Sequence, residues 1–237
     1  MNVIERYAKI VGLLLLLSIV GGGVGEGYVP AMIIVSGNAA ATAKNIASSE
    51  LMFRAGFAAY LVEGICDVAL ALLFYFVLRP VRNDLALLAA FFGLVSMITF
   101  AFAEFFYFAA LRLVTSAHDL KSFSPDQWNT AALMSLRFYS LAGGLFMLFY
   151  GLAWMVRGFL IFRSQYLPKF LGVLFTVAGL GFLTRNVALV LAPHYASDLL
   201  VLPMFIAMIA MAVWMLTKGI DSEKWQAMAG SLDPSAG

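Results

Sequence analysis

Hydrophobic residues fall into six long runs separated by short polar segments. The runs cover residues 7–28, 53–78, 85–114, 131–162, 170–191 and 199–217. About 20 apolar residues in a helix cross the hydrocarbon core of a bilayer. The runs are apolar on every side, whereas barrel strands are short and alternate apolar with polar residues. The pattern predicts an all-α polytopic membrane protein, a single six-transmembrane-helix bundle over residues 1–220 with a polar, fraying tail at 221–237.

Composition agrees with this class and excludes others. Hydrophobic residues make up 63% of the 237 residues and charged residues 12%, against roughly 45–50% and about 25% in soluble domains. The net charge of +2 is dispersed, with no basic run, which argues against a nucleic-acid partner. The single cysteine, Cys66, and the two histidines offer neither an internal disulfide nor a usual zinc site. We therefore expect the lipid bilayer as a partner, and no cofactor or metal.

Basic residues are distributed unevenly between the two sets of connecting segments, which predicts the orientation of the helices. The first set also contains the chain termini and has Arg157 close by. It holds Arg6, Lys9, Arg79, Arg82, Arg163, Lys169, Lys218 and Lys224, and the other set holds Lys44, Arg54 and Lys121. The positive-inside rule therefore places both termini in the cytoplasm. The first run follows charged residues much as a signal peptide does, but no small-residue cleavage pattern follows it closely, so we expect the helix to be retained.

Two connectors on the outer side carry helix signals. Asn38 precedes a segment at 39–49 that is expected to form a short interfacial helix with Asn38 as its cap. Ser124-Pro125-Asp126-Gln127 is typical of a capping box with proline at the first helical position. The fourth helix is therefore predicted to begin outside the bilayer.

Charged residues within the apolar runs gather at one predicted depth. Counted from charged residues at the cytoplasmic helix ends, this level is about 16–20 residues, or about 24–30 Å, away. Its members are Glu26, Glu63, Glu104, Arg137 and Arg185. Asp67 lies deeper, about 18 Å of helix from Arg79. Intramembrane charges are costly and mark candidate functional residues.

Two interpretations of this layer remain open. With Arg54 and Arg112 slightly farther out, the acids and bases balance at four each, which favours ion pairs that lock the helix ends together. Alternatively, the layer lines a polar vestibule in which Arg137 and Arg185 receive an anionic or zwitterionic group. Glu63 and Asp67 stand four residues apart on one helix face, a spacing that suits proton coupling or acid–base chemistry.

Glycines and histidines carry weaker signals. Gly144, Gly151 and Gly158 recur every seven residues after Arg137, which indicates a seam for close helix packing. In the first run, two overlapping G-xxx-G spacings cover residues 21–27 and favour packing, with local unwinding before Glu26 as the alternative. A metal site formed by His118, Asp119, His194 and Asp198 in the outer connectors has no fixed spacing to support it.

Three stretches resemble a bacterial membrane family of unknown function, DUF4386. The first runs from Gly37-Asn38-Ala39 to Leu51-Met52-Phe53-Arg54, and the second from Cys66-Asp67-Val68 to Leu78-Arg79-Pro80-Val81. The third and most distinctive runs from Gly158-Phe159-Leu160 to Leu167-Pro168-Lys169. The resemblance spans nearly the whole chain and implies a multi-helix protein of the bacterial plasma membrane without established chemistry. Gly93 and Ala153 depart from the family pattern, in which Arg and His are common at these positions.

The sequence contains no nucleotide-binding loop, nucleophile elbow or redox cysteine pair, so we predict no catalytic residue and do not favour an enzyme. The working hypothesis is a protein that binds or transports a small anionic or zwitterionic molecule at this charged layer, which is expected to face outward. Arg137 and Arg185 would hold its anionic group, Glu63 and Asp67 would supply proton or cation coupling, and Glu26 and Glu104 would complete the site. The alternatives are a membrane-embedded enzyme for a lipid-like substrate and a structural or regulatory subunit with every charge paired.

Overall fold

The computed structural model describes residues 2–115 and 123–230, and this part of the chain is helical without strands. Six helices are long and apolar enough to cross a membrane, which confirms the predicted fold class. They are Val3–Ile33, Glu50–Leu78, Asn83–Thr115, Pro125–Arg163, Lys169–Leu191 and Asp198–Thr217. Each contains the corresponding predicted span, and the fourth extends six residues beyond its predicted start, as its capping box requires.

The first and last spanning helices are composite. The first consists of α1 (Val3–Gly22), the π-helical segment η1 (Gly23–Tyr28) and α2 (Val29–Ile33). The last joins the 3₁₀ turn η4 (Asp198–Val201) to α8 (Leu202–Thr217). Between them lie α4 (Glu50–Leu78), α5 (Asn83–Thr115), α6 (Pro125–Arg163) and α7 (Lys169–Leu191). Three short helices, α3 (Ala39–Ser48), η3 (Pro193–Tyr195) and α9 (Ser222–Gly230), lie in the connectors and after α8.

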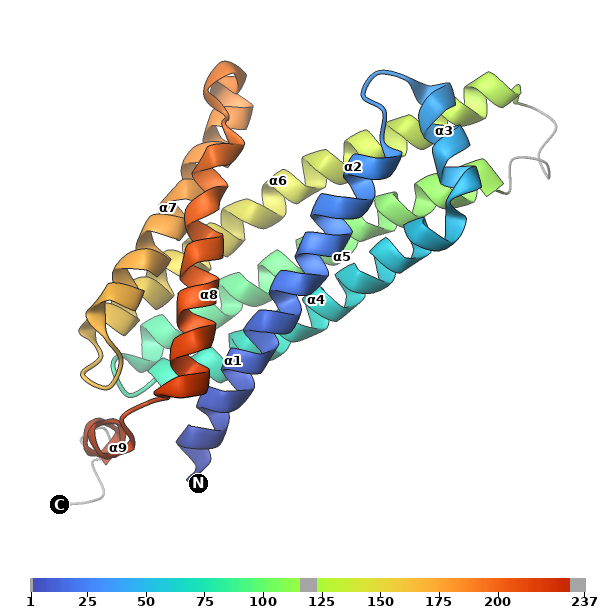
Figure 1. The fold of residues 1–237 in the computed structure, drawn as a ribbon. Coiled ribbons are helices and arrows are strands. Elements are labelled where there is room, and N and C mark those ends of the chain that lie inside the picture. The colour runs from blue at the N-terminus through green and yellow to red at the C-terminus, as the bar shows by residue number, and fades with distance from the viewer. Residues whose placement is uncertain (1, 116–122, 231–237) are drawn as a thin grey trace.

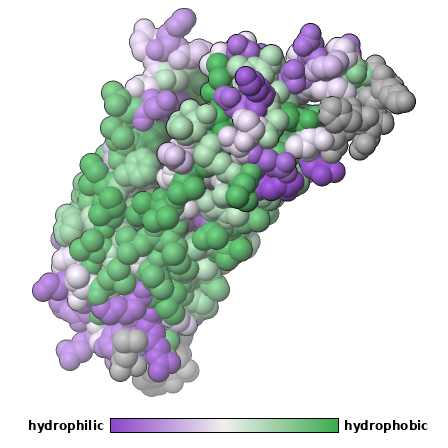
Figure 2. Space-filling view, turned by 45° about the vertical axis from the view of Figure 1, so that its right-hand side comes forward, coloured by the Kyte–Doolittle hydropathy of each residue, from purple (hydrophilic) through white to green (hydrophobic). Residues whose placement is uncertain are grey.

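The helices form two groups that diverge at one end of the molecule. In Figure 1, α4, α5 and α6 run side by side. The α7–α8 hairpin diverges from α6 at the end of the molecule that carries α2 and α3. The N-terminus and the end of the described chain lie together at the opposite end. Figure 2 shows an apolar belt between hydrophilic ends, as a bilayer-embedded surface requires. The cytoplasmic assignment of the termini remains a prediction from charge.

Glycines bring α6 and α7 into close contact. A Cβ atom added at Gly158 would lie 2.6 Å from the backbone nitrogen of Thr176, and one at Gly151 would lie 2.9 Å from the carbonyl oxygen of Gly179. Gly172 and Gly179 on α7 approach the α6 backbone equally closely. Packing is therefore the role of Gly151 and Gly158, as expected from their spacing.

The glycine-rich part of the first helix packs with only one of its two G-xxx-G pairs. A Cβ atom at Gly21 would lie 2.9 Å from the Ala59 carbonyl, and one at Gly25 would lie 3.1 Å from the Gly56 carbonyl, both on α4. Gly23 and Gly27 would meet nothing within 4 Å. The chain does not unwind before Glu26, because the helix continues through the π-helical segment, a conformation often found at functional sites.

The structure confirms the two predicted helix caps but differs from the prediction for the C-terminal tail. The Asn38 side chain accepts a hydrogen bond from the Ala41 backbone nitrogen, and Ser124 and Gln127 form both bonds of the predicted capping box. The prediction that the whole tail frays is wrong for residues 222–230, which form α9. The Trp225 side chain anchors this helix by donating from Nε1 to the Val77 carbonyl oxygen at 2.9 Å.

Candidate functional site

A cavity of about 420 Å³ lies among the first helix, α4, α6, α7 and the η4–α8 segment. Its polar lining residues come from all five parts of the fold. They are Ser18, Glu26, Glu63, Tyr150, Arg185 and Asp198. The remaining wall is mainly aromatic and methionine side chains: Phe146, Met147, Phe182, Met204, Phe205 and Met208. A few polar groups in an otherwise apolar cavity of this size are typical of small-molecule sites.

Two glutamates form the acidic wall of this cavity. Glu26 projects from the π-helical segment and is exposed, whereas Glu63 of α4 is half-buried. Gly22 makes room for Glu63, because a Cβ atom at position 22 would lie 2.8 Å from its Oε1. The other carboxylate oxygen of Glu63, Oε2, is buried without a hydrogen-bond partner. The structure therefore places an incompletely satisfied carboxylate beside the cavity, where a donor group on a ligand would complete its hydrogen bonds.

Asp67 lies behind the cavity lining and is 6% exposed. Its Oδ1 accepts a hydrogen bond from the Ser18 hydroxyl at 2.9 Å, and its Oδ2 accepts one from the Tyr150 hydroxyl at 2.8 Å. Both donors line the cavity. Asp67 therefore ties α1, α4 and α6 together directly beneath the cavity, and one helical turn separates it from Glu63.

Arg157 is a buried charge that the sequence analysis assigned to the cytoplasmic helix end. It is 4% exposed, its Nε has no hydrogen-bond partner, and its guanidinium lies 5.2 Å from the centre of the Phe74 ring. A Cβ atom at Gly93 would lie 2.7 Å from Nη2, so the glycine leaves space for the guanidinium. The one sequence signal for this arrangement is Gly93 itself, the single glycine of α5.

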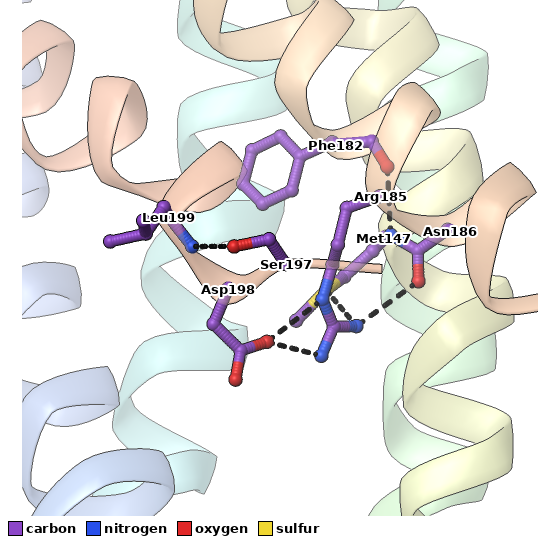
Figure 3. A network of polar contacts seen from close by, with 7 residues as sticks. All are labelled: Met147, Phe182, Arg185, Asn186, Ser197, Asp198 and Leu199. Atoms are coloured by element: carbon purple, nitrogen blue, oxygen red, sulfur yellow. Dashed lines mark hydrogen bonds and ion pairs between the residues drawn. The ribbon is translucent and has the colours of Figure 1, made fainter. Parts of the chain in front are cut away.

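Arg185 carries the positive charge of the cavity wall, and a carboxylate from η4, Asp198, binds it. Its Nη2 and Nε donate to Oδ1 of Asp198 at 2.8 and 3.1 Å, and its Nη1 donates to Oδ1 of Asn186 at 3.3 Å. Figure 3 shows Arg185 extending from α7 toward Asp198. The Asp198 side chain is 87% exposed and that of Arg185 is 22% exposed. Asp198 is therefore the more accessible and more easily displaced partner.

The expected pairing of deep acids with arginines does not occur. Within residues 2–115 and 123–230, none of Glu26, Glu63, Asp67 and Glu104 forms an ion pair with an arginine. Arg54 instead binds Glu50 one turn away on its own helix. A helical position fixes depth but not the direction in which a side chain points, so residues at one level can face different neighbours.

Two of the predicted site residues lie outside this cavity. Arg137 is exposed and does not line it, although Arg185 does. Glu104 is buried at the interface of α4 and α5 and lines a different hollow. The structure thus brings Glu26, Glu63 and Arg185 together around one cavity with Asp67 beneath it, and leaves Arg137 and Glu104 apart. Of the four residues considered as a metal site, His118 and Asp119 lie outside the described residues. Among the described residues, no cluster of three or more His, Cys, Asp or Glu side chains could hold a metal ion.

Three tyrosines, which the sequence analysis did not group, form a cluster, and one of them, Tyr60, lines the same hollow as Glu104. The hydroxyls of Tyr60 and Tyr139 are hydrogen-bonded to each other, while the Tyr107 hydroxyl is buried without a partner. The three rings make edge contacts with centroid distances of 5.4–6.0 Å. The three residues come from α4, α5 and α6, so no local pattern in the sequence predicts the cluster.

Comparisons with known proteins give a family without assigned chemistry. The family model described as "Domain of unknown function (DUF4386)" matches residues 10–219. An "Uncharacterized protein" from Archaeoglobus fulgidus is 29% identical over 155 residues, which cover 65% of this chain and 78% of the relative. No solved structure matches. These relatives have no assigned activity, so the cavity provides the evidence for function.

Proposed function

We propose a ligand-binding role for this chain, which belongs to the DUF4386 family. The proposed ligand is a small zwitterion with an apolar body, bound in the cavity lined by Glu26, Glu63 and Arg185. This proposal depends on one observation: a cavity of about 420 Å³ has an acidic wall, one accessible arginine and an apolar wall.

The charges of the lining favour a ligand that contains an ammonium group. Three carboxylates, those of Glu26, Glu63 and Asp198, face this cavity with one guanidinium, that of Arg185. A purely anionic ligand would meet excess negative charge, and Arg137 is not available as a second cation. A zwitterion satisfies both signs, so this geometry supports the zwitterionic part of the sequence-based hypothesis over the anionic part.

Each part of the proposed ligand has a counterpart in the lining. The ammonium group would donate to Glu63, whose Oε2 lacks a partner, and to Glu26. The anionic group would take the place of exposed Asp198 on the Arg185 guanidinium, which is suited to bidentate carboxylate binding. The apolar body would contact the Met147 and Phe146 side of the cavity.

Transport with proton coupling through Glu63 and Asp67 is the finer form of this proposal. Asp67 accepts from Ser18 and Tyr150 across three helices, so these hydrogen bonds would have to break to open a path below the cavity. Alternating access to a midplane site generally involves such rearrangements between helix groups. Uptake into proteoliposomes, with and without a proton gradient, separates transport from binding alone.

Binding can be tested with purified protein in detergent. The probes are L-leucine, L-phenylalanine and phosphocholine, followed by thermal unfolding, because a ligand of the native state raises the unfolding temperature. We expect at least one probe to stabilise the wild type, and Glu63→Gln and Arg185→Gln to weaken this effect by about tenfold or more in concentration. Arg137→Gln, a matched loss of an arginine outside the cavity, should respond like the wild type.

Two outcomes would overturn the proposal. If none of the three zwitterions stabilises the folded wild type, the cavity does not serve this ligand class. Equal responses in wild type, Glu63→Gln and Arg185→Gln would show that binding occurs elsewhere. Failure of both tests would favour the structural or regulatory role.

A further inference from the structure

A second hollow of about 520 Å³ lies between α4 and α5 and shares no lining residue with the first cavity. From α4 it is lined by Phe57, Tyr60, Leu61, Gly64, Ile65 and Val68. From α5 it is lined by Met97, Phe100, Ala101, Glu104 and Phe105. Leu61, Ile65 and Phe105 are at least half exposed on this apolar surface. The hollow is therefore accessible from the side of the helix bundle that contacts lipid.

Glu104 is the single charged residue of this lining and is 4% exposed. Both of its carboxylate oxygens are buried without a hydrogen-bond partner. Among the residues that the structure describes, it forms no ion pair. A buried carboxylate without donors is costly in an apolar environment, so its presence at the wall of a hollow indicates a site that a donor-bearing group completes.

We propose that this hollow binds a lipophilic primary ammonium ion, an amine with an aromatic or aliphatic body, which enters from the hydrocarbon core. The ammonium group would donate hydrogen bonds to the two free oxygens of Glu104, and charge-assisted bonds of this kind are the stronger ones. Aromatic rings of Phe57, Tyr60 and Phe100 surround the same space and attract a cation to their faces. The apolar remainder of the ligand would contact Leu61 and Ile65.

Other ligand classes fit the lining less well. A divalent metal ion requires several oxygen ligands, whereas Glu104 is the lone carboxylate here, and no group of metal ligands occurs in the described parts of the chain. An anion would face Glu104 without a compensating arginine or lysine in the lining. A neutral apolar molecule would leave the carboxylate oxygens unsatisfied. A monovalent organic cation meets both the charge and the apolar surface.

The position of the site distinguishes it from the proposed zwitterion site. Tyr60 lines this hollow and its hydroxyl is hydrogen-bonded to Tyr139, whereas no tyrosine of this cluster lines the first cavity. Glu63 lines the first cavity and Glu104 lines the second. Substitutions at these two glutamates should therefore separate the two binding activities.

Equilibrium binding of tritiated 2-phenylethylammonium to the full-length protein in lipid nanodiscs tests the proposal. We expect saturable binding in the wild type that includes one Glu104-dependent site per chain. Glu104→Gln, which keeps the size of the side chain but removes its charge, should weaken binding about tenfold or more. Glu50→Gln is the matched control, because Glu50 lies on α4 but lines neither cavity, and this variant should bind the probe like the wild type. Unlabelled 2-phenylethanol, which has the same body without the charge, should compete poorly.

A second variant tests the volume of the hollow without altering charge. A Cβ atom at Gly64 would make ordinary contacts of 3.7 Å with Phe100, so the larger side chain of Gly64→Val would extend into the hollow. This variant should also lose binding while keeping a folded, monodisperse protein. Absence of saturable binding to the wild type would overturn the proposal. Wild-type affinity in a folded Glu104→Gln protein would overturn it as well, and would make Glu104 a buried neutral acid of structural function.

Discussion

Replacing Gly158 with alanine should separate α6 from α7 and destabilise the whole bundle. The added Cβ atom would lie 2.4 Å from Oγ1 of Thr176, 2.6 Å from its backbone nitrogen and 2.8 Å from the carbonyl oxygen of Gly172. Two of these three atoms belong to the α7 backbone, which cannot move away unless the helix moves. A side-chain rotation therefore cannot relieve this clash, whereas it could relieve a clash with the end of a flexible side chain.

The magnitude follows from two opposing effects. Overpacking typically costs about 1–3 kcal/mol, and a clash with two backbone atoms belongs at the upper end. Alanine gains up to about 1 kcal/mol over glycine through helix propensity. We therefore expect a net loss of about 2 kcal/mol in the free energy of unfolding. For a chain of this size, that loss lowers the unfolding temperature by roughly 4–8 °C.

Gly143→Ala provides a matched control on the same helix. A Cβ atom at Gly143 meets nothing within 4 Å, so this variant adds helix propensity without a clash and should unfold at or above the wild-type temperature. Thermal unfolding in detergent, followed by far-UV circular dichroism, measures both variants. If Gly158→Ala unfolds at the same temperature as Gly143→Ala, glycine-dependent contact between α6 and α7 does not limit the stability of this fold.

Three further predictions concern the cavity and the C-terminal helix. Asp67→Asn retains an acceptor for Tyr150 but removes the charge beneath the cavity, so folded protein should bind zwitterions about tenfold more weakly in the thermal-shift measurement. Gly22→Ala adds a Cβ atom 2.8 Å from Oε1 of Glu63; because a carboxylate end can swing away, we expect weaker zwitterion binding with a nearly unchanged unfolding temperature. Hydrogen bonds from the side chain and the backbone nitrogen of Lys224 lower the pKa of Asp221. The ionised Asp221 should therefore stabilise α9 at pH values above the ordinary aspartate pKa, and this stabilisation should be lost as the pH falls through the lowered pKa. Hydrogen exchange of the α9 amides, expressed as protection factors, measures this effect.

Each of these predictions has a control or a contradicting outcome. Wild-type zwitterion affinity in Asp67→Asn would remove Asp67 from the working site. Gly23→Ala, whose Cβ atom meets nothing within 4 Å, should leave Glu63 in place and is the neighbouring control for Gly22→Ala. Asp221→Asn should abolish the pH dependence of the α9 protection factors, which are corrected for the intrinsic pH dependence of amide exchange. A dependence of the protection factors that persists in this variant would assign it to another group.

The sequence by itself determined the elements and their depth. Apolar runs predicted all six spanning helices, and Asn38 and Ser124 identified two helix starts, because hydrophobicity and capping are local properties. The seven-residue spacing of Gly151 and Gly158 predicted a packing seam for the same reason. Counting along each helix also placed Glu63 and Asp67 one turn apart, with Asp67 the deeper of the two.

The tertiary structure alone decided which of these residues meet. Arg137 and Arg185 have similar predicted depths, yet only Arg185 lines the cavity, and Asp198 after the end of its helix binds it. Arg157 is buried rather than exposed at a helix end, because Gly93 of α5 leaves space for its guanidinium. The physical reason is that hydrophobicity fixes the position of a helix along the membrane normal. Its rotation about its own axis and its tilt depend on the shapes of neighbouring helices far away in the sequence.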